Sequence, residues 1–328
     1  MKIIITGVAG FIGSNLAEKL LNDGHEILGI DNFSYGRSYN IRKLLKSNKF
    51  SFVDGDVMDA NVLDSLKGDA LVHLASQKIP RYDNSLRTLE ENAAMTDNVI
   101  KKCLKDDIKL IFASTSDVYG KNPDIPFTEN HNLVLGPTPV KRWAYAASKI
   151  FSEHKIIANG EANNLTYTIV RFFGSYGVNQ NLTWWGGPQS VFINKAFEND
   201  IIEIHGDGLQ TRTFTYIGDT VDALSRCVVD PKANGDVFNI AGNPDEEIAI
   251  VDLAKTIWEL IRPGEEPKLK FIPYSTFGNY EDVRRRVPSI DKICNELGYT
   301  PNHTLKEGLT AAIKWQREFL EEEAKELS

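Results

Sequence analysis

The chain has 328 residues, of which 42% are hydrophobic and 25% are charged, and its formal net charge at pH 7 is -8. That composition is typical of a globular protein with a sizeable core, and the acidic balance argues against nucleic acid or an anionic membrane as the main partner. The three cysteines, Cys103, Cys227 and Cys294, are too scattered for a disulfide framework or a metal site. No apolar run reaches the roughly 18 residues of a membrane span, and the N-terminal run is too short for a signal peptide. We therefore expect a cytoplasmic protein that binds no metal.

Short apolar runs alternate with amphipathic stretches through the first half of the chain, a pattern typical of strands that alternate with helices. The runs predict buried strands over residues 3–6, 26–30, 51–53, 70–73, 110–114 and 166–171, with a later strand over 237–240. The amphipathic stretches predict helices over residues 14–22, 92–104 and 144–159. Right-handed crossovers between such strands give a parallel sheet with helices on both faces. The predicted fold class is therefore α/β, a Rossmann-type doubly wound parallel sheet with a smaller C-terminal α/β domain.

The character of the sequence changes near Gly174, after which glycine, proline and tryptophan become dense. The predicted first domain covers residues 1–174, to which about 216–242 return, and the second covers 175–215 and 243–328. Within the second domain, the loop Trp184–Gly187 is predicted either to shape a ligand pocket or to be structural. From about Glu318 the charges predict a solvated helix end rather than a binding element.

A glycine motif, Thr6-Gly7-Val8-Ala9-Gly10-Phe11-Ile12-Gly13, follows the first predicted strand and opens the first helix. Gly7 permits a tight turn, Gly10 lets the backbone approach a pyrophosphate at the positive end of the helix, and Gly13 allows close helix–sheet packing. Asp31 ends the second predicted strand, where a carboxylate binds an adenosine ribose and repels a 2′-phosphate, which favours NAD over NADP. The alternative is an α/β turn that is merely rich in glycine. The predicted cofactor-binding residues are Gly7, Gly10, Phe11, Ile12, Gly13, Asp31, Asn32, Asp56, Val57, Leu74, Ala75, Tyr145 and Lys149.

A second motif, Tyr145-Ala-Ala-Ser-Lys149, lies where a helix is expected after the fifth strand. Residues at i and i+4 share a helix face, so the phenol and the ammonium can point at one ligand. A lysine and an oxidised nicotinamide both favour the phenolate, which brings a tyrosine with an ordinary pKa of about 10 into range as a base near neutrality. Thr115 is predicted to bond the hydroxyl group that is oxidised, whereas Asp117 either contacts the substrate or caps the turn. The predicted catalytic residues are Thr115, Ser116, Tyr145 and Lys149, and the alternative for the last two is a chance pair on a surface helix.

Together and in this order, these motifs resemble the extended short-chain dehydrogenases that modify nucleotide sugars. The resemblance covers nearly the whole chain, including the segments 31–36, 74–77, 205–217 and 280–288. It implies an NAD cofactor, a UDP-sugar substrate, an NAD-binding first domain, a sugar-nucleotide-binding second domain and a homodimer formed through the helices 92–104 and 144–159. It also implies that Arg212 and Arg286 bind the nucleotide diphosphate, for which fork-shaped guanidinium donors are suited. The sequence departs from many relatives at Gly177-Val178-Asn179, where they have Gly-Pro-Arg.

Within that family, the residues at positions 115–117 indicate which of the known activities the chain is expected to have. The 4,6-dehydratases carry Thr-Asp-Glu there, so Thr115-Ser116-Asp117 argues against dehydration, and the UDP-glucuronate decarboxylases carry Thr-Ser-Glu. A carboxylate displaced by about one carbon–carbon bond can cost about 100-fold in rate, which favours a UDP-sugar 4-epimerase acting on a UDP-hexose or UDP-hexuronic acid through a 4-keto intermediate. The alternatives are a UDP-glucuronate decarboxylase that forms UDP-xylose or a 4-keto-pentose, a reductase that releases its cofactor, and an NAD-binding sensor without turnover. The predicted substrate-binding residues are Thr115, Asp117, Tyr145, Asn179, Arg212 and Arg286.

Overall fold

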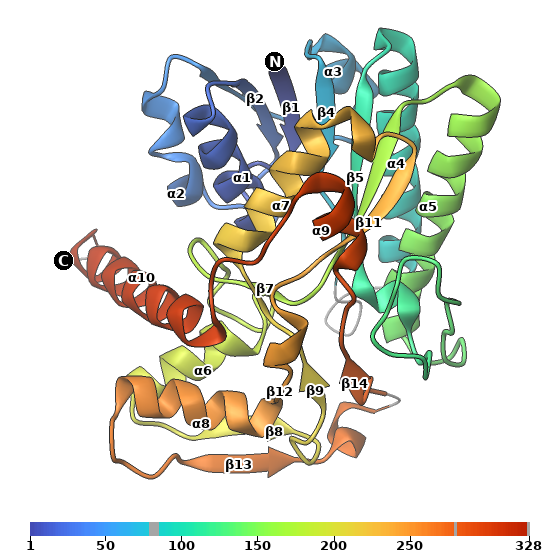
Figure 1. Ribbon diagram of the computed structural model, residues 1–328. Helices are drawn as coiled ribbons and strands as arrows, with labels where there is room; N and C mark the ends of the chain where they lie inside the picture. Colours follow the sequence, from blue (N-terminus) through green and yellow to red (C-terminus); the bar gives the residue numbers. More distant parts are fainter. Residues whose placement is uncertain (79–84, 279–280, 327–328) are drawn as a thin grey trace.

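The computed structural model describes residues 1–78, 85–278 and 281–326 of the chain. Among these residues, seven parallel strands form one sheet with the order β11-β6-β5-β4-β1-β2-β3, which lies in the upper half of Figure 1. The strands are β1 (Lys2–Thr6), β2 (Glu26–Asp31), β3 (Phe50–Asp54), β4 (Ala70–His73), β5 (Lys109–Thr115), β6 (Tyr167–Phe172) and β11 (Asp236–Ile240). The predicted doubly wound parallel sheet is therefore confirmed, and the late strand returns to it beside β6.

Helices cover both faces of this sheet. Alternate residues of each strand point to opposite faces, so each strand contributes to two cores. In β1, Ile3 and Ile5 belong to the core on one face and Ile4 to the core on the other, and all three are fully buried. The helices of the first core are α1 (Phe11–Asn22), α7 (Ile217–Val229) and α9 (Asp291–Leu297). Those of the second core are α3 (Ala60–Ser65), α4 (Ser85–Asp106) and α5 (Arg142–Asn163). Burial on both faces is the physical reason for the unbroken apolar runs of the strands.

The helices α1, α4 and α5 begin earlier than the sequence predicts. Helix α1 starts at Phe11 rather than Ser14, because the extended backbone of Gly10 stands at its N-cap position. Helix α5 starts at Arg142 rather than Ala144. Apolar periodicity marks the buried face of a helix, so it misses a first turn that carries polar or loop-facing residues.

The order of the strands places a crevice at the carboxyl ends of β1 and β4. From β1 the chain adds β2 and β3 on one side, and then β4, β5 and β6 on the other. Thr6 at the end of β1 is in register with both Ile30 and His73, so the strand ends lie next to one another. A parallel sheet binds ligands at such a switch point.

A second group of elements lies below the large sheet in Figure 1. Its strands pair as β7 (Ser175–Tyr176) with β10 (Thr215–Tyr216), β8 (Ile202–His205) with β13 (Leu269–Ile272), and β9 (Thr211–Arg212) with both β12 (Ile248–Ala249) and β14 (Arg285–Arg286). Helices α6 (Pro188–Phe197) and α8 (Ile250–Ile261) share a core with this group. Since β9 and β14 run parallel with Arg212 opposite Arg286, the two arginines predicted from separate motifs are register partners.

The C-terminal helix α10 (Leu305–Glu326) extends from this lower group towards α2 (Ser38–Ile41), as Figure 1 shows. Phe319 is buried and packs edge-on against Tyr39, with ring centroids 4.6 Å apart. Glu322 accepts hydrogen bonds from Tyr39 (3.0 Å) and Arg42 (2.5 Å). The helix end predicted to be solvated from Glu318 is exposed at Glu318, Glu321 and residues 323–325, but the buried Phe319 anchors it, which the charges alone did not predict. No helix in the described part of the chain combines the length and apolarity that a membrane span requires.

Candidate active site

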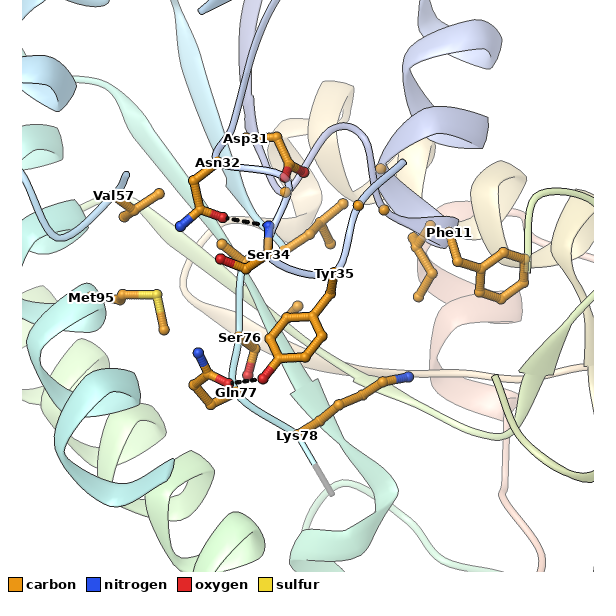
Figure 2. Close-up of a pocket in the computed structure, with 18 of the residues that line it drawn as sticks. Phe11, Asp31, Asn32, Ser34, Tyr35, Val57, Ser76, Gln77, Lys78 and Met95 are labelled. Atoms are coloured by element: carbon orange, nitrogen blue, oxygen red, sulfur yellow. Dashed lines mark hydrogen bonds between the residues drawn. The ribbon is translucent and has the colours of Figure 1, made fainter. Parts of the chain in front are cut away.

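A cavity of about 340 Å³ opens at the switch point of the large sheet. All the predicted cofactor-binding residues line it, from the glycine motif to Tyr145 and Lys149. Figure 2 shows Asp31 and Asn32 on one side of this cavity, Phe11 on another, and Tyr35 and Gln77 below them in the view, joined by a hydrogen bond. Their gathering in one cavity supports their predicted roles, which stay predictions.

The glycine motif shapes the cavity in the way that a dinucleotide requires. Gly7 has φ of +72°, and an added Cβ would lie 2.9 Å from the backbone nitrogen of Ala75. A Cβ on Gly13 would lie 2.2 Å from the carbonyl oxygen of Gly7, so the helix approaches the loop more closely than any side chain allows. At Gly10, an added Cβ would lie 3.1 Å from the same oxygen, a milder conflict. The loop and the N-terminus of α1 therefore form a cradle that fits a pyrophosphate.

We expect Gly13→Ala to destabilise the fold by about 1–3 kcal/mol, the usual cost of forcing a methyl group into packed backbone, and to abolish NAD retention. Gly10→Ala is the matched control and should cost less, because its conflict involves a contact of 3.1 Å rather than 2.2 Å. Urea denaturation and the nucleotide content of the purified protein would measure both effects. Equal stability of the two variants would contradict this account of the cradle.

Asp31 links the second strand to the glycine loop. Its carboxylate accepts hydrogen bonds from the backbone nitrogens of Ala9 (2.9 Å) and Phe33 (2.8 Å). The next residue, Asn32, donates to Asp56 (2.9 Å), which joins the ends of β2 and β3. These contacts hold the Asp31 carboxylate at the edge of the cavity, where the sequence predicts that it binds the adenosine ribose.

Tyr35 bridges the cavity from the β2–α2 loop. Its hydroxyl donates to Gln77 (2.7 Å), which in turn donates to Glu91 on α4 (2.6 Å). Its ring lies 5.0 Å from that of Trp185, in the loop predicted to shape a ligand pocket or to be structural. Trp185 therefore lines the cofactor cavity, whereas Trp184 stacks on His205 in the lower group of elements.

Tyr145 and Lys149 lie on one face of α5, as predicted, and both line the cavity. The Lys149 ammonium donates to the carbonyl oxygen of Ala113 (2.8 Å) and lies 6.0 Å from the centre of the Tyr145 ring. Burial lowers the pKa of Lys149 to about 7, against an opposing effect of Glu153. Burial, and then the charge of Asp117, raise the pKa of Tyr145 above its ordinary value. These shifts come from the protein groups alone, and the expectation that Lys149 together with an oxidised nicotinamide brings Tyr145 into range as a base stays a prediction.

Thr115 and the two residues after it form the end of β5 and a 3₁₀ turn over Ser116–Tyr119. Thr115 Oγ1 accepts a hydrogen bond from the Asp117 backbone nitrogen (3.2 Å), so the threonine caps the turn. The Asp117 side chain instead bonds two arginines through Oδ1: Arg286 at 2.5 Å and Arg142 at 3.2 Å. Arg286 also reaches the hydroxyl of Ser116 (3.4 Å). Thr115, and not Asp117, therefore caps the turn. The Asp117 side chain instead belongs to a group of charged side chains, which we call the ionic cluster.

This ionic cluster connects the predicted catalytic residues to the lower group of elements. Asp282 accepts hydrogen bonds from Arg142 and Arg212, both at 2.9 Å. The order of contacts is therefore Arg286–Asp117–Arg142–Asp282–Arg212. Burial by itself raises the pKa values of Asp117 and Asp282, but the arginines outweigh it and lower both, that of Asp282 to about 2. Asp117 and Asp282 are therefore ionised at neutral pH.

One turn after Lys149 on α5, Glu153 forms a buried ion pair with Arg171. Arg171 on β6 donates to both oxygens of Glu153 on α5, from Nη2 at 2.7 Å and from Nε at 3.1 Å. The Ser114 hydroxyl, next to Thr115, donates to the same carboxylate. The two charged side chains are 6% and 5% exposed, so each charge is stabilised mainly by the opposite charge of its partner and little by water.

The structure brings together some residues that the sequence analysis did not select. These residues are Arg142 and Asp282, which belong to the ionic cluster. Arg142 could have been identified from the sequence, because it lies three residues before Tyr145 on the same helix. Asn179 has φ of +66° and donates to Ser14 of α1 (3.2 Å), so it lines the cofactor cavity away from the ionic cluster. Tyr280, the first residue of the segment 280–288, lies outside the described residues.

The comparisons with known proteins agree with this geometry. A family model described as the NAD dependent epimerase/dehydratase family matches residues 3–241. The chain is similar to the UDP-N-acetyl-alpha-D-glucosaminuronate decarboxylase of Bacillus cytotoxicus, with 34% identity over 97% of this chain and 98% of that protein. It is similar to UDP-glucuronic acid decarboxylase 1 of Xenopus tropicalis, with 32% identity over 98% of this chain and 74% of that protein. A solved structure of the UDP-glucuronic acid 4-epimerase of Bacillus cereus, in complex with UDP-glucuronic acid and NAD, superimposes with a TM-score of 0.86 at 26% identity, covering 97% of this chain and 100% of that one.

Proposed function

The chain belongs to the NAD-dependent epimerase/dehydratase family and is an NAD-dependent enzyme that modifies a nucleotide sugar, and we propose that its reaction is the decarboxylation of a UDP-hexuronic acid. The 4-epimerase favoured by the sequence has less support, because the two curated relatives described above, at 34% and 32% identity, are both decarboxylases. The argument for the epimerase was that the carboxylate of Asp117 is too short. In the structure that carboxylate is held by Arg286 at 2.5 Å.

The observation that carries the proposal is the ionised Asp117 between Arg286 and Arg142, beside Thr115. Guanidinium groups suit a sugar carboxylate, which a hexuronic acid has and a hexose lacks. A carboxylate held in this way opposes the turning of the keto sugar that an epimerase needs. An ionised aspartate nearby also disfavours a second carboxylate, and loss of carbon dioxide relieves that repulsion.

The proposed reaction begins with oxidation at C4. NAD, held by the glycine cradle and Asp31, would supply the acceptor for the hydride that leaves C4. The C4 hydroxyl proton passes to the phenolate form of Tyr145, with the Thr115 hydroxyl bonded to the same oxygen. The resulting β-keto acid loses carbon dioxide as the C5–C6 electron pair moves to the C4 oxygen, where the Tyr145 phenol donates a hydrogen bond. C5 then takes a proton from solvent, which gives the 4-keto-pentose. Formation of the pentose would further require return of the hydride to C4 and return of the Tyr145 proton to the C4 oxygen.

A 4-epimerase is the second candidate, because the superimposed Bacillus cereus enzyme is a UDP-glucuronic acid 4-epimerase. It would share the oxidation at C4 and the roles of Tyr145 and Lys149. It would differ in returning the hydride to the opposite face of an intact hexuronic acid.

The test is to incubate the purified protein with UDP-glucuronate, UDP-N-acetylglucosaminuronate and UDP-glucose separately, and to follow the products by proton NMR. We expect a UDP-linked pentose or 4-keto-pentose from one of the two acids, with release of carbon dioxide labelled from C6. A C4 epimer of unchanged mass would instead establish the epimerase. A product from UDP-glucose alone would contradict the assignment of an acidic sugar.

A further inference from the structure

Arg142 occupies a distinctive place in the ionic cluster. It begins α5 three residues before Tyr145 and seven before Lys149, so the three side chains follow one face of the helix. Its guanidinium donates from Nη1 to the carbonyl oxygen of Glu281 (2.8 Å) and to Asp282 (2.9 Å), and from Nη2 to Asp117 (3.2 Å). Its side chain is 13% exposed. The Arg142 guanidinium therefore lies between the predicted catalytic residues and the lower group of elements.

Asp282 fixes the orientation of this guanidinium. Its Oδ1 accepts from Arg142 (2.9 Å), from Arg212 (2.9 Å) and from the backbone nitrogen of Val283 (2.8 Å), and its Oδ2 accepts from the Tyr274 hydroxyl (3.0 Å). A carboxylate that is held by so many donors cannot turn without breaking several bonds. Asp282 therefore acts as a fixed anchor for guanidiniums that come from α5 on one side and β9 on the other.

The charges of the cluster do not balance. Among the described residues it contains three arginines and two aspartates, so it carries one more positive than negative charge on side chains that are between 13% and 25% exposed. A poorly solvated positive charge is costly unless an anion approaches it. A hexuronic acid brings one more negative charge to the site than the corresponding hexose.

The contact distances indicate which arginine meets that extra charge. Arg286 is held by Asp117 at 2.5 Å, whereas Arg142 lies 3.2 Å from the same oxygen, the longest ionic contact in the cluster. The Arg142–Asp117 contact is therefore the one that a sugar carboxylate replaces at least cost. Arg212 lies on β9, beyond Asp282 and further along the cluster from Tyr145.

We propose that Arg142 is the specificity-determining residue that binds the acid group of the sugar, and that Asp282 is the positioning residue that orients it. This inference rests on the acidic-sugar substrate class of the proposed function. The ligand chemistry is a carboxylate on the sugar ring, whatever reaction follows its binding.

The test measures binding rather than turnover, in a Tyr145→Phe background and with NAD present. Calorimetric dissociation constants are obtained for UDP-glucuronate and for UDP-glucose. We expect Arg142→Gln to weaken UDP-glucuronate binding by about 10- to 100-fold, the range for loss of a hydrogen bond to a charged group, and UDP-glucose binding by less than about 3-fold. Asp282→Asn should change the ratio of the two constants in the same direction. In the double variant the ratio of the two constants should change no more than in Arg142→Gln alone, because the two residues act as a unit on the acid group.

Arg284→Gln is the matched control, since Arg284 is 61% exposed and pairs with Asp207 on the surface. It should leave both dissociation constants unchanged. Equal weakening of both ligands by Arg142→Gln, or an unchanged ratio, would overturn the inference. If the ratio changes as expected but the unmodified enzyme produces a C4 epimer, the inference holds and the decarboxylase proposal fails. If a pentose forms but the ratio is unchanged, the inference fails alone.

Discussion

Replacing Tyr145 with phenylalanine should lower kcat by about 1000-fold, because a positioned acid–base group typically contributes about 100- to 10,000-fold to a rate. The phenol is buried at the edge of the cofactor cavity, beside Lys149 and close to the charge of Asp117. Removing its oxygen leaves no other described hydroxyl with the same place on α5. The ring itself is kept, and the glycine cradle is untouched, so NAD should still bind. Product formation by NMR and the nucleotide released on denaturation measure the two effects separately.

Tyr39→Phe is the control for the loss of a tyrosine hydroxyl. Tyr39 lies on α2 and bonds Glu322 of the C-terminal helix, outside the lining of the cofactor cavity. Its variant should keep the rate of the unmodified enzyme. Unchanged turnover in Tyr145→Phe, or loss of NAD binding together with turnover, would contradict the role assigned to the phenol.

The second large effect is expected on stability, from Glu153→Gln. This change keeps the shape of the side chain but leaves Arg171 as an uncompensated buried charge, since the pair is 6% and 5% exposed. Removing one partner of a buried ion pair costs about 3–5 kcal/mol. The free energy of unfolding from urea titrations should fall by that amount. Activity should fall too, because Glu153 also accepts from Ser114, next to Thr115.

Glu203→Gln provides the comparison on the surface. Glu203 pairs with Lys270 at 3.3 Å, and the two side chains are 51% and 59% exposed. Such a pair contributes less than about 1 kcal/mol. If Glu153→Gln and Glu203→Gln lower the free energy of unfolding equally, the buried pair does not have the role that we assign to it.

The fold and the cofactor could be predicted from the sequence because their signals are local. The strands of the large sheet contain short apolar runs, such as Ile3–Ile5 in β1, because both faces of the sheet are covered. The glycines of the first loop are required by contacts within a few residues, as between Gly13 and Gly7. The doubly wound sheet and NAD, both confirmed, follow from such short-range patterns.

The ionic cluster could not be predicted in the same way, because its members meet only through the tertiary structure. Arg212 and Arg286 become neighbours through the parallel register of β9 and β14, and Asp282 joins Arg142 from a segment 140 positions later. Phe319 is buried for the same reason, since only the folded chain brings Tyr39 against it. The sequence by itself determined the sheet, the cofactor cradle and the Tyr145–Lys149 pair, which depend on periodicity and short spacing. Only the tertiary structure decided which charges face one another, since electrostatic pairing depends on distances in space that no local pattern records.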